Sequence, residues 1–157
     1  MKDIIGELDN LEKKINLAKF KTKDYSLNKD QFYFSKDVIS LKNVNNNLVG
    51  IVEENDLQNL YLSYKTLNNN FENEPLHSLI DLEEFNKYEF NIVVNNDNLK
   101  LIPYIIHYKE KTKSKLTRIE NDNKIIDFTG DDKCRLTFKI IGHGNFEIES
   151  IRITPKG

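Results

Sequence analysis

Apolar and polar residues alternate with a period of two along most of the chain after residue 31. In the segment KYEFNIVV (87–94), every second residue from Tyr88 to Val94 is apolar, and the polar Glu89 and Asn91 fall between them. Only a strand that buries one of its faces needs this alternation. The segment therefore predicts a β-strand packed on a hydrophobic core.

Similar segments follow one another at intervals of about ten residues, with Asn, Gly and Asp between them. Clustered asparagines, as in NVNNN (43–47), favour turns because the amide bonds to nearby backbone and tolerates the left-handed region. Strands are predicted within 31–43, 47–52, 59–67, 87–94, 99–110, 115–121, 124–128, 134–141 and 145–153. Strands at this spacing, without alternating helices, indicate an all-β sandwich or barrel.

The last two predicted strands flank a Gly-His-Gly segment and are expected to form a closing β-hairpin. Gly142 and Gly144 supply the positive backbone angles that a tight turn requires, and His143 is expected to be an exposed turn residue. The side chains of the first strand that are expected to face the core are Leu136, Phe138 and Ile140.

An irregularity is predicted in the final strand. Phe146 and Ile148 alternate in phase with an inward face, but Ile151 and Ile153 fall one residue out of that phase. A β-bulge near Glu149–Ser150 would return all four apolar side chains to the core.

Residues 3–20 follow a helical period instead. Their apolar side chains recur at spacings of three and four on one helical face: Ile4, Leu8, Leu11, Ile15 and Ala18. We expect an N-terminal α-helix over residues 1–22 that packs on the domain, and a self-associating segment or an interdomain linker are the alternatives. A polar connection at residues 21–30 leads to the β-sandwich domain at 31–157.

The totals limit the class of protein. A chain of 157 residues suffices for one domain, and its 38% hydrophobic and 31% charged residues are typical of soluble globular proteins. The net charge of −2 argues against a nucleic-acid partner and against attraction to anionic lipids. No signal peptide and no segment of ~20 apolar residues occurs, so we expect no membrane insertion. The expected location is cytoplasmic, either free or at the inner face of the membrane through a parent protein.

Candidate chemistry is sparse. His77, His107 and His143 are far apart in sequence and lack metal-type spacing, and no nucleophile elbow or phosphate-binding loop occurs. We therefore expect a domain that is not itself an enzyme and that needs no cofactor or metal. Cys134 has no partner for an intrachain disulfide and is expected to be a small buried side chain.

Two acidic clusters have alternative interpretations. Glu147 and Glu149 share one strand face, where paired carboxylates can perform acid–base chemistry, but solvated charge is the favoured interpretation. The segment 122–132 offers oxygen ligands of the kind that calcium prefers, although the EF-hand spacing is absent and a polar turn is favoured. Its aspartates are Asp122, Asp127, Asp131 and Asp132.

The C-terminal half resembles a known group of domains. A strand LKLIPYIIHY (99–108), a strand RLTFKII (135–141), a Gly-x-Gly turn (142–144) and a final strand FEIESIRI (146–153) are similar to jelly-roll modules with a galactose-binding-like fold. The sequence most resembles accessory domains of bacterial glycosyltransferases that build capsule, teichoic acid or other surface glycans of the cell wall. The resemblance covers about the last 75 residues well and the region from Gln31 loosely.

The resemblance implies both a fold and a function. It implies an antiparallel jelly-roll β-sandwich, similar to carbohydrate-binding modules, that binds or positions a carbohydrate or glycan acceptor for parent enzyme domains. The alternative is a protein–protein or homo-oligomerisation module that uses the N-terminal helix or an exposed sheet face. A carbohydrate module requires an open face with Tyr and Arg, whereas an assembly module requires a flat apolar patch.

Sugar binding uses aromatic faces and a few planar polar groups. The chain has no tryptophan, so tyrosines are the candidate platforms. An arginine on an exposed sheet face could add hydrogen bonds to sugar hydroxyls. The candidate carbohydrate-binding residues are Tyr61, Tyr104, His107, Tyr108 and Arg135.

The strand that carries three of these candidates is apolar on both faces. Tyr104 and Tyr108 share one face and lie roughly 13 Å apart along the strand, whereas His107 points the opposite way. Because Tyr104 shares its face with Ile102 and Ile106, a place in the core is the favoured alternative for it.

Overall fold

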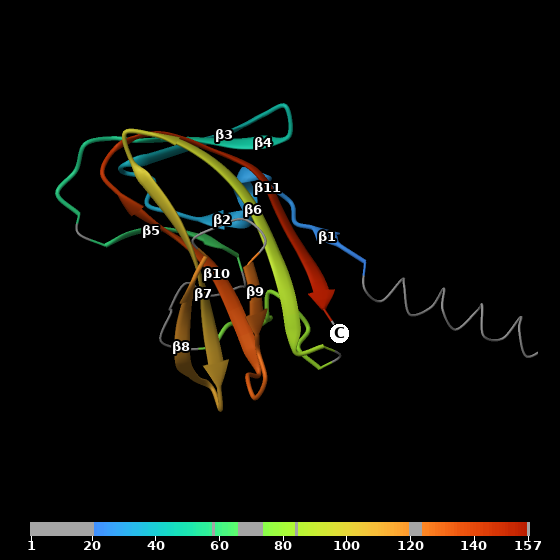
Figure 1. Cartoon of the computed structure of the whole chain (residues 1–157). Helices are drawn as coiled ribbons and strands as arrows, with labels where there is room; N and C mark the ends of the chain where they lie inside the picture. The colour runs from blue at the N-terminus through green and yellow to red at the C-terminus, as the bar shows by residue number, and fades with distance from the viewer. Residues whose placement is uncertain (1–20, 58, 66–73, 84, 120–123, 157) are drawn as a thin grey trace, which may run out of the picture.

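The computed structural model describes residues 21–57, 59–65, 74–83, 85–119 and 124–156, which form two antiparallel β-sheets (Figure 1). The first sheet has the strand order β3-β4-β11-β6-β9, and β1 also pairs with β11. The strands of this sheet are β1 (Lys23–Asp24), β3 (Ile39–Val44), β4 (Asn47–Val52), β6 (Lys87–Asp97), β9 (Lys124–Asp127) and β11 (Gly144–Lys156). The second sheet has the order β2-β5-β10-β7-β8; its strands are β2 (Phe32–Tyr33), β5 (Leu60–Tyr64), β7 (Lys100–Lys109), β8 (Thr112–Arg118) and β10 (Lys133–Ile141). A short 3-10 turn, η1 (Lys29–Gln31), precedes β2. The prediction of an all-β sandwich is confirmed.

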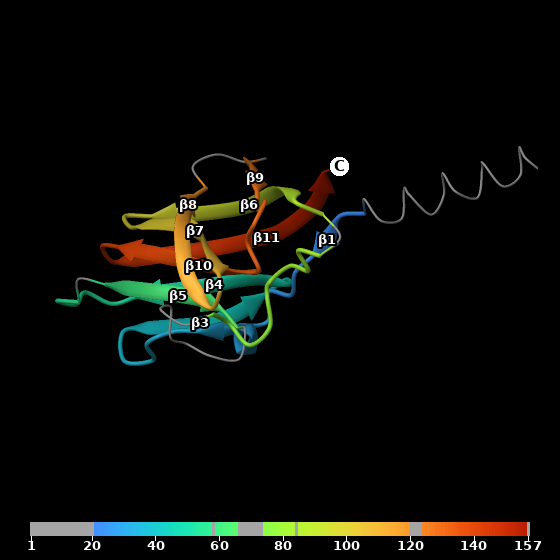
Figure 2. The same ribbon diagram turned by 90° about the horizontal axis from the view of Figure 1, so that it is seen from below.

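The hydrophobic core lies between the two sheets. Tyr88, Phe90 and Ile92 of β6 are buried, as their alternation predicted, and so are Leu136, Phe138 and Ile140 of β10. Burying one large apolar side chain contributes about 1.5–3 kcal/mol to folding, so the buried side chains of β6 and β10 supply much of the stability of the sandwich. β6 and β11 run side by side along most of their length, which Figure 2 shows from below.

The predicted N-terminal helix falls on residues 1–20, which lie outside the described part of the chain. Part of the expected polar connection at residues 21–30 joins the sandwich. Lys23 and Asp24 pair with Ile153 and Arg152 of β11, and Leu27 packs in the core.

The predicted closing hairpin is wrong. β10 ends in the second sheet at Ile141 and β11 begins in the first sheet at Gly144, so the Gly-His-Gly segment crosses from one sheet to the other. Gly142 and Gly144 have the expected positive φ values, 90° and 135°. A Cβ at Gly144 would lie 2.5 Å from the carbonyl oxygen of Asp97, at the crossing between β6 and β7. The β10–β11 connection therefore packs directly against the β6–β7 connection, and a glycine at position 144 permits this close contact.

The predicted bulge in the final strand is confirmed. The register of β11 against β6 shifts between Ile148 and Ser150. Phe146, Ile148, Ile151 and Ile153 are all buried as a result, because the extra residue reverses the alternation between the two pairs.

The asparagine turn is also confirmed. Asn45 and Asn46 join β3 to β4 with φ values of 51° and 68°. Both lie in the left-handed region, which asparagine adopts more readily than most residues.

Cys134 is buried in the core, as expected. Burial raises the pKa of its thiol to about 12, and the Ser78 hydroxyl lies 3.9 Å from its sulfur.

Since the thiolate is the reactive form, we predict that iodoacetamide at pH 8 leaves the native protein unmodified and alkylates one site after denaturation in guanidinium. Intact-mass spectrometry measures both states, and labelling of the native protein at the denatured rate would contradict the prediction.

Candidate functional site

The side of the second sheet that faces away from the core, which we call the outer face, carries the candidate site. Inward residues such as Leu62, Ile105 and Phe138 belong to the core, so the residues that alternate with them point outward. Strand pairing places these outward positions next to one another across β2, β5, β10, β7 and β8.

One row of polar and aromatic residues crosses all five strands. In spatial order these neighbours are Tyr33, Ser63, Thr137, Tyr104 and Arg118. The hydroxyl oxygens of Ser63 and Thr137 lie 2.8 Å apart, and both residues are buried. This hydrogen bond joins β5 to β10 at the centre of the row. In a neighbouring row, Lys139 pairs with Tyr61.

A bulge in the pairing of β7 with β8 determines which residues of β8 lie at the edge of the outer face. The register shifts between His107 and Tyr108, so that Lys115 is opposite His107 and Lys113 is opposite Tyr108. Cross-strand partners share a face, so Lys113 points outward with Tyr108. It lines the outer face together with Leu116, whose side chain is 54% exposed.

Two hollows on the outer face meet at Tyr61. The first has a volume of about 170 Å³ and lies between Tyr61 and Tyr104, with Lys113, Thr137 and Lys139 also lining it. The second, of about 420 Å³, lies on the β2 side of Tyr61 and is lined by Tyr33, Asn59 and Ser63 among others. Both tyrosines are half-buried, so part of each side chain is accessible.

The structure brings together two of the five predicted site residues at a hollow. Tyr61 and Tyr104 line it, and the expectation that Tyr104 belongs to the core is wrong because its apolar neighbours on β7 also point outward. Arg135 and Tyr108 lie on the same sheet face, with the Arg135 guanidinium 5.8 Å from the centre of the Tyr108 ring. Both are fully buried, so the expectation that Arg135 is exposed is wrong.

His107 lies apart from this site, on the inward side of β7, as its alternation with Tyr104 predicted. Its Nδ1 lies 2.7 Å from Asp131 Oδ2 and its Nε2 lies 2.7 Å from the Thr117 hydroxyl. A carboxylate can only accept, so Nδ1–H donates to Asp131 and Nε2 accepts from Thr117. The ring is fully buried against Phe128, and burial lowers its pKa despite the opposing effect of Asp131. A ligand role for His107 is therefore not supported.

Sequence reasoning missed Thr137, Lys139 and Lys113. The first two alternate with core residues of β10, so the period of two contained the signal for their outward positions. Lys113 reaches the outer face only through the bulge in β8, which leaves no local signal in the sequence.

The aspartates considered for calcium have separate structural partners. Asp127 accepts hydrogen bonds from the backbone and hydroxyl of Thr129, which lower its pKa, and Asp132 accepts one from the backbone of Glu110. Asp131 binds His107, and Asp122 lies outside the described residues. In the described ranges, no group of three or more His, Cys, Asp or Glu side chains is arranged to hold a metal ion.

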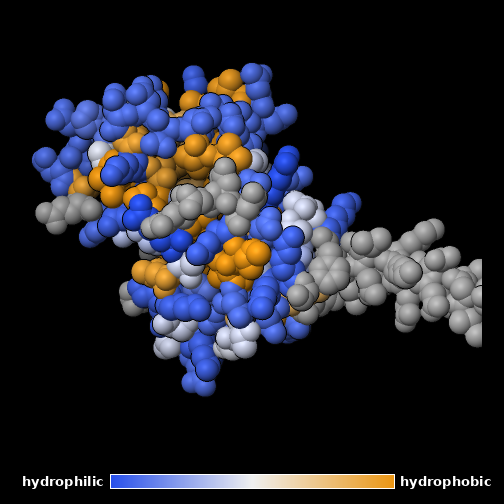
Figure 3. Space-filling view, viewed as in Figure 1, coloured by the Kyte–Doolittle hydropathy of each residue, from blue (hydrophilic) through white to orange (hydrophobic). Residues whose placement is uncertain are grey.

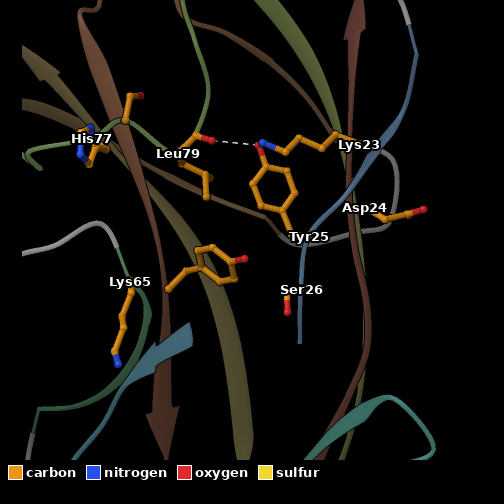
Figure 4. A pocket seen from close by; sticks show the side chains of 9 residues that line it. Lys23, Asp24, Tyr25, Ser26, Lys65, His77 and Leu79 are labelled. Carbon is orange, nitrogen blue, oxygen red and sulfur yellow. Dashed lines mark hydrogen bonds between the residues drawn. The ribbon is translucent and has the colours of Figure 1, made fainter. Parts of the chain in front are cut away.

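A third hollow, of about 310 Å³, lies beside β1 and contains none of the predicted residues (Figure 4). The Tyr25 hydroxyl donates a hydrogen bond of 2.8 Å to the carbonyl of Leu79, and the Tyr25 ring meets Tyr64 edge-on at 5.7 Å. Burial raises the pKa of Tyr25. These contacts hold the segment after β1 against the sandwich, so we assign Tyr25 a structural role.

Hydrophilic residues cover much of the molecule in Figure 3, and apolar residues gather in the upper part of that view and in smaller patches below. Leu116 on the outer face and Ile51 on β4 are among the exposed apolar residues. Within the described residues, no helix has the length and apolar character needed to cross a bilayer.

Comparison with known proteins identifies a shared fold. No family model and no curated protein matches the sequence. The glycosylation-associated protein (Gap123) complex from Streptococcus agalactiae contains a similar chain, with a TM-score of 0.54 and 11% identity over 86% of this chain and 44% of that one. This chain therefore spans less than half the length of that relative.

Two further structures are similar over most of their own length. The carbohydrate-binding module CBM1 of BiXyn10A, in its apo form, has a TM-score of 0.53 and 11% identity over 87% of this chain and 98% of that one. The structure of accessory secretory proteins 1, 2 and 3 of Streptococcus pneumoniae has a TM-score of 0.50 and 8% identity over 79% of this chain and 90% of that one. By its fold, the chain is similar to a carbohydrate-binding module and to chains of glycosylation-associated and accessory secretory proteins of streptococci.

Proposed function

We propose that the chain is a non-catalytic accessory module that binds carbohydrate on the outer face of its second sheet. The observation that carries this proposal is the pairing of Tyr61 and Tyr104 at one hollow, with the Thr137 and Lys139 side chains between them. An accessible aromatic ring beside hydroxyl and amino groups is what a pyranose requires.

Each group has a distinct part in binding. The apolar C–H groups of a sugar ring would pack on the Tyr rings, while the Lys139 ammonium group donates hydrogen bonds to the sugar hydroxyls. The contact between the buried Ser63 and Thr137 hydroxyls joins β5 to β10 beneath the ligand, so this part of the sheet is ordered before binding.

The fold supports a more specific hypothesis. The likeness to a carbohydrate-binding module and to a streptococcal glycosylation protein supports a galactose-binding-like jelly roll that positions a glycan for a bacterial surface-glycan glycosyltransferase. In this hypothesis the parent enzyme supplies the catalysis, and the module works in the cytoplasm or at the inner face of the membrane. Fold similarity alone does not assign a function, so the binding residues must be tested directly.

We predict that Tyr61→Ala and Tyr104→Ala each weaken glycan binding about tenfold or more, because each removes one ring platform worth roughly 1.4 kcal/mol. Glycan-array screening followed by isothermal titration calorimetry measures the affinity. Ile51→Ala is the matched control, since Ile51 is 48% exposed on β4 of the first sheet. Equal loss in all three variants, or unchanged binding in both tyrosine variants, would contradict the assignment of the site.

A second candidate function is a protein–protein module. It is favoured by two of the similar structures, which are assemblies of several proteins, and by the exposed Leu116 on the outer face. Light scattering separates the two functions: a stable oligomer that Leu116→Ser disrupts, together with no glycan bound, would favour this candidate.

A further inference from the structure

The two sheets differ sharply in charge. The five strands of the second sheet contain eight lysines and arginines and no aspartate or glutamate. The strands of the first sheet contain six of each sign. Since the whole chain has a net charge of −2, the second sheet carries an excess of positive charge on a weakly acidic protein, with Arg135 alone of its cations fully buried.

Three of the outward cations of the second sheet lie around the proposed site. Lys113 and Lys139 line the hollow between the two tyrosines, and Arg118 is opposite Tyr104 in register. Lys133, farther along β10, is engaged by Glu74 at 3.6 Å and by backbone carbonyls of the same loop. No ion pair in the described part of the chain involves Lys139.

The excess of positive charge on the strands around Lys139 favours the binding of an anion at its ammonium group, since opposite charges attract. The first sheet has no such excess, because its strands carry equal numbers of acidic and basic residues, and pairs such as Arg152–Asp24 and Lys156–Glu89 form there. A lysine that is half-buried beside aromatic rings also attracts an anion more strongly than a fully solvated one does, because the local dielectric constant is lower.

On the basis of the carbohydrate-binding role proposed above, we propose that the ligand of the outer face is an acidic oligosaccharide. Its sugar rings pack on Tyr61 and Tyr104, and its carboxylate or phosphate groups bind Lys139 and Lys113. Charge complementarity selects the acidic glycan, while the aromatic platform distinguishes a sugar from a simple anion.

The first experiment compares matched glycans in a binding array with the whole chain. The probes are oligogalacturonate and its methyl ester, a phosphorylated mannose oligosaccharide and its unphosphorylated form, a panel of neutral glycans, and polyglutamate. We expect an acidic probe to bind on the order of tenfold tighter than its neutral partner. The advantage should shrink from ~0.1 M to ~1 M salt, as the Debye length falls from about 10 Å to about 3 Å.

The outcomes separate this inference from the proposed function. Binding of neutral glycans alone overturns the acidic ligand but retains the carbohydrate module. Binding of no glycan overturns both, and binding of polyglutamate alone indicates an acidic protein partner. The carboxylate and phosphate arms show which anionic group the site prefers.

The second experiment tests whether the charge acts locally. Lys139→Glu is expected to weaken binding of the acidic glycan on the order of tenfold or more, and to leave binding of a neutral glycan within about twofold. Lys42→Glu makes the same change in net charge on exposed β3 of the first sheet and is expected to have little effect on either. Equal losses for Lys139→Glu and Lys42→Glu would overturn the assignment of the anion to Lys139.

Discussion

Gly50→Ala is expected to destabilise the sandwich by about 3 kcal/mol and to lower the Tm by roughly 6–12 °C. A Cβ at Gly50 would lie 2.1 Å from Cζ and 2.3 Å from Cε1 of Phe146, its cross-strand partner on β11. Phe146 is buried in the core, so its ring cannot turn aside without displacing its neighbours. Thermal and urea unfolding measure the loss, and Lys42→Ala on the adjacent strand is the exposed control.

The mechanism is tested by a compensating change. Phe146→Leu alone leaves a cavity, but in the Gly50→Ala background it also removes the clash, so the double variant should lose at least about 1 kcal/mol less than the sum of the two single losses. Additive losses would show that the alanine acts through the backbone of β4 and not through the Phe146 ring. Gly50 is the cross-strand partner of Phe146, and the Phe146 ring lies over it. A residue without a side chain is therefore needed at position 50 of β4.

Much of the fold could be predicted because alternation is a local property. The period of two located Tyr88–Ile92 and the strands that follow, and the change of phase between Ile148 and Ile151 located the bulge. A hydrophobic pattern fixes which side of a strand is buried whatever strand lies beside it.

The pairing of strands could not be predicted in the same way. The Gly-His-Gly segment suits a tight hairpin, yet it connects strands of different sheets because β11 pairs with β4 and β6 while β10 pairs with β5 and β7. Which partner wins depends on contacts between residues far apart in sequence, such as Gly144 against Asp97. Local turn chemistry does not contain that information.

The candidate site shows the same limit. β7 is apolar on both faces, so the sequence alone could not decide whether Tyr104 or Ile105 faces the core. The structure assigns Ile105 to the core and Tyr104 to the outer face. The sequence could not show that Arg135 is buried either, because its burial depends on residues that only the fold brings near.

His107→Leu is expected to destabilise the protein by about 3 kcal/mol near neutral pH. The substitution removes both hydrogen bonds of the imidazole and leaves Asp131, whose side chain is 8% exposed, without its His107 contact. Losing one partner of a buried polar pair costs more than the net value of the bond, since the remaining group is desolvated. Urea unfolding at pH 7.5 measures the change, and His143→Gln is the control because His143 is exposed at the crossing between the sheets.

The pH dependence distinguishes His107 from a residue that matters only for packing. Burial lowers its folded-state pKa below the unfolded value of about 6.5, so between these two values the unfolded chain binds the extra proton. The stabilisation is therefore fully present above about pH 6.5 and is lost as the pH falls toward the folded pKa. His107→Leu should abolish this component of the slope between pH 7 and pH 5, whereas His143→Gln should keep it. Parallel stability curves for the wild type and His107→Leu would mean that the imidazole has the same pKa in the folded and the unfolded chain. A wild type that gains stability relative to His107→Leu as the pH falls would mean that the imidazole is protonated in the fold, as an ion pair with Asp131.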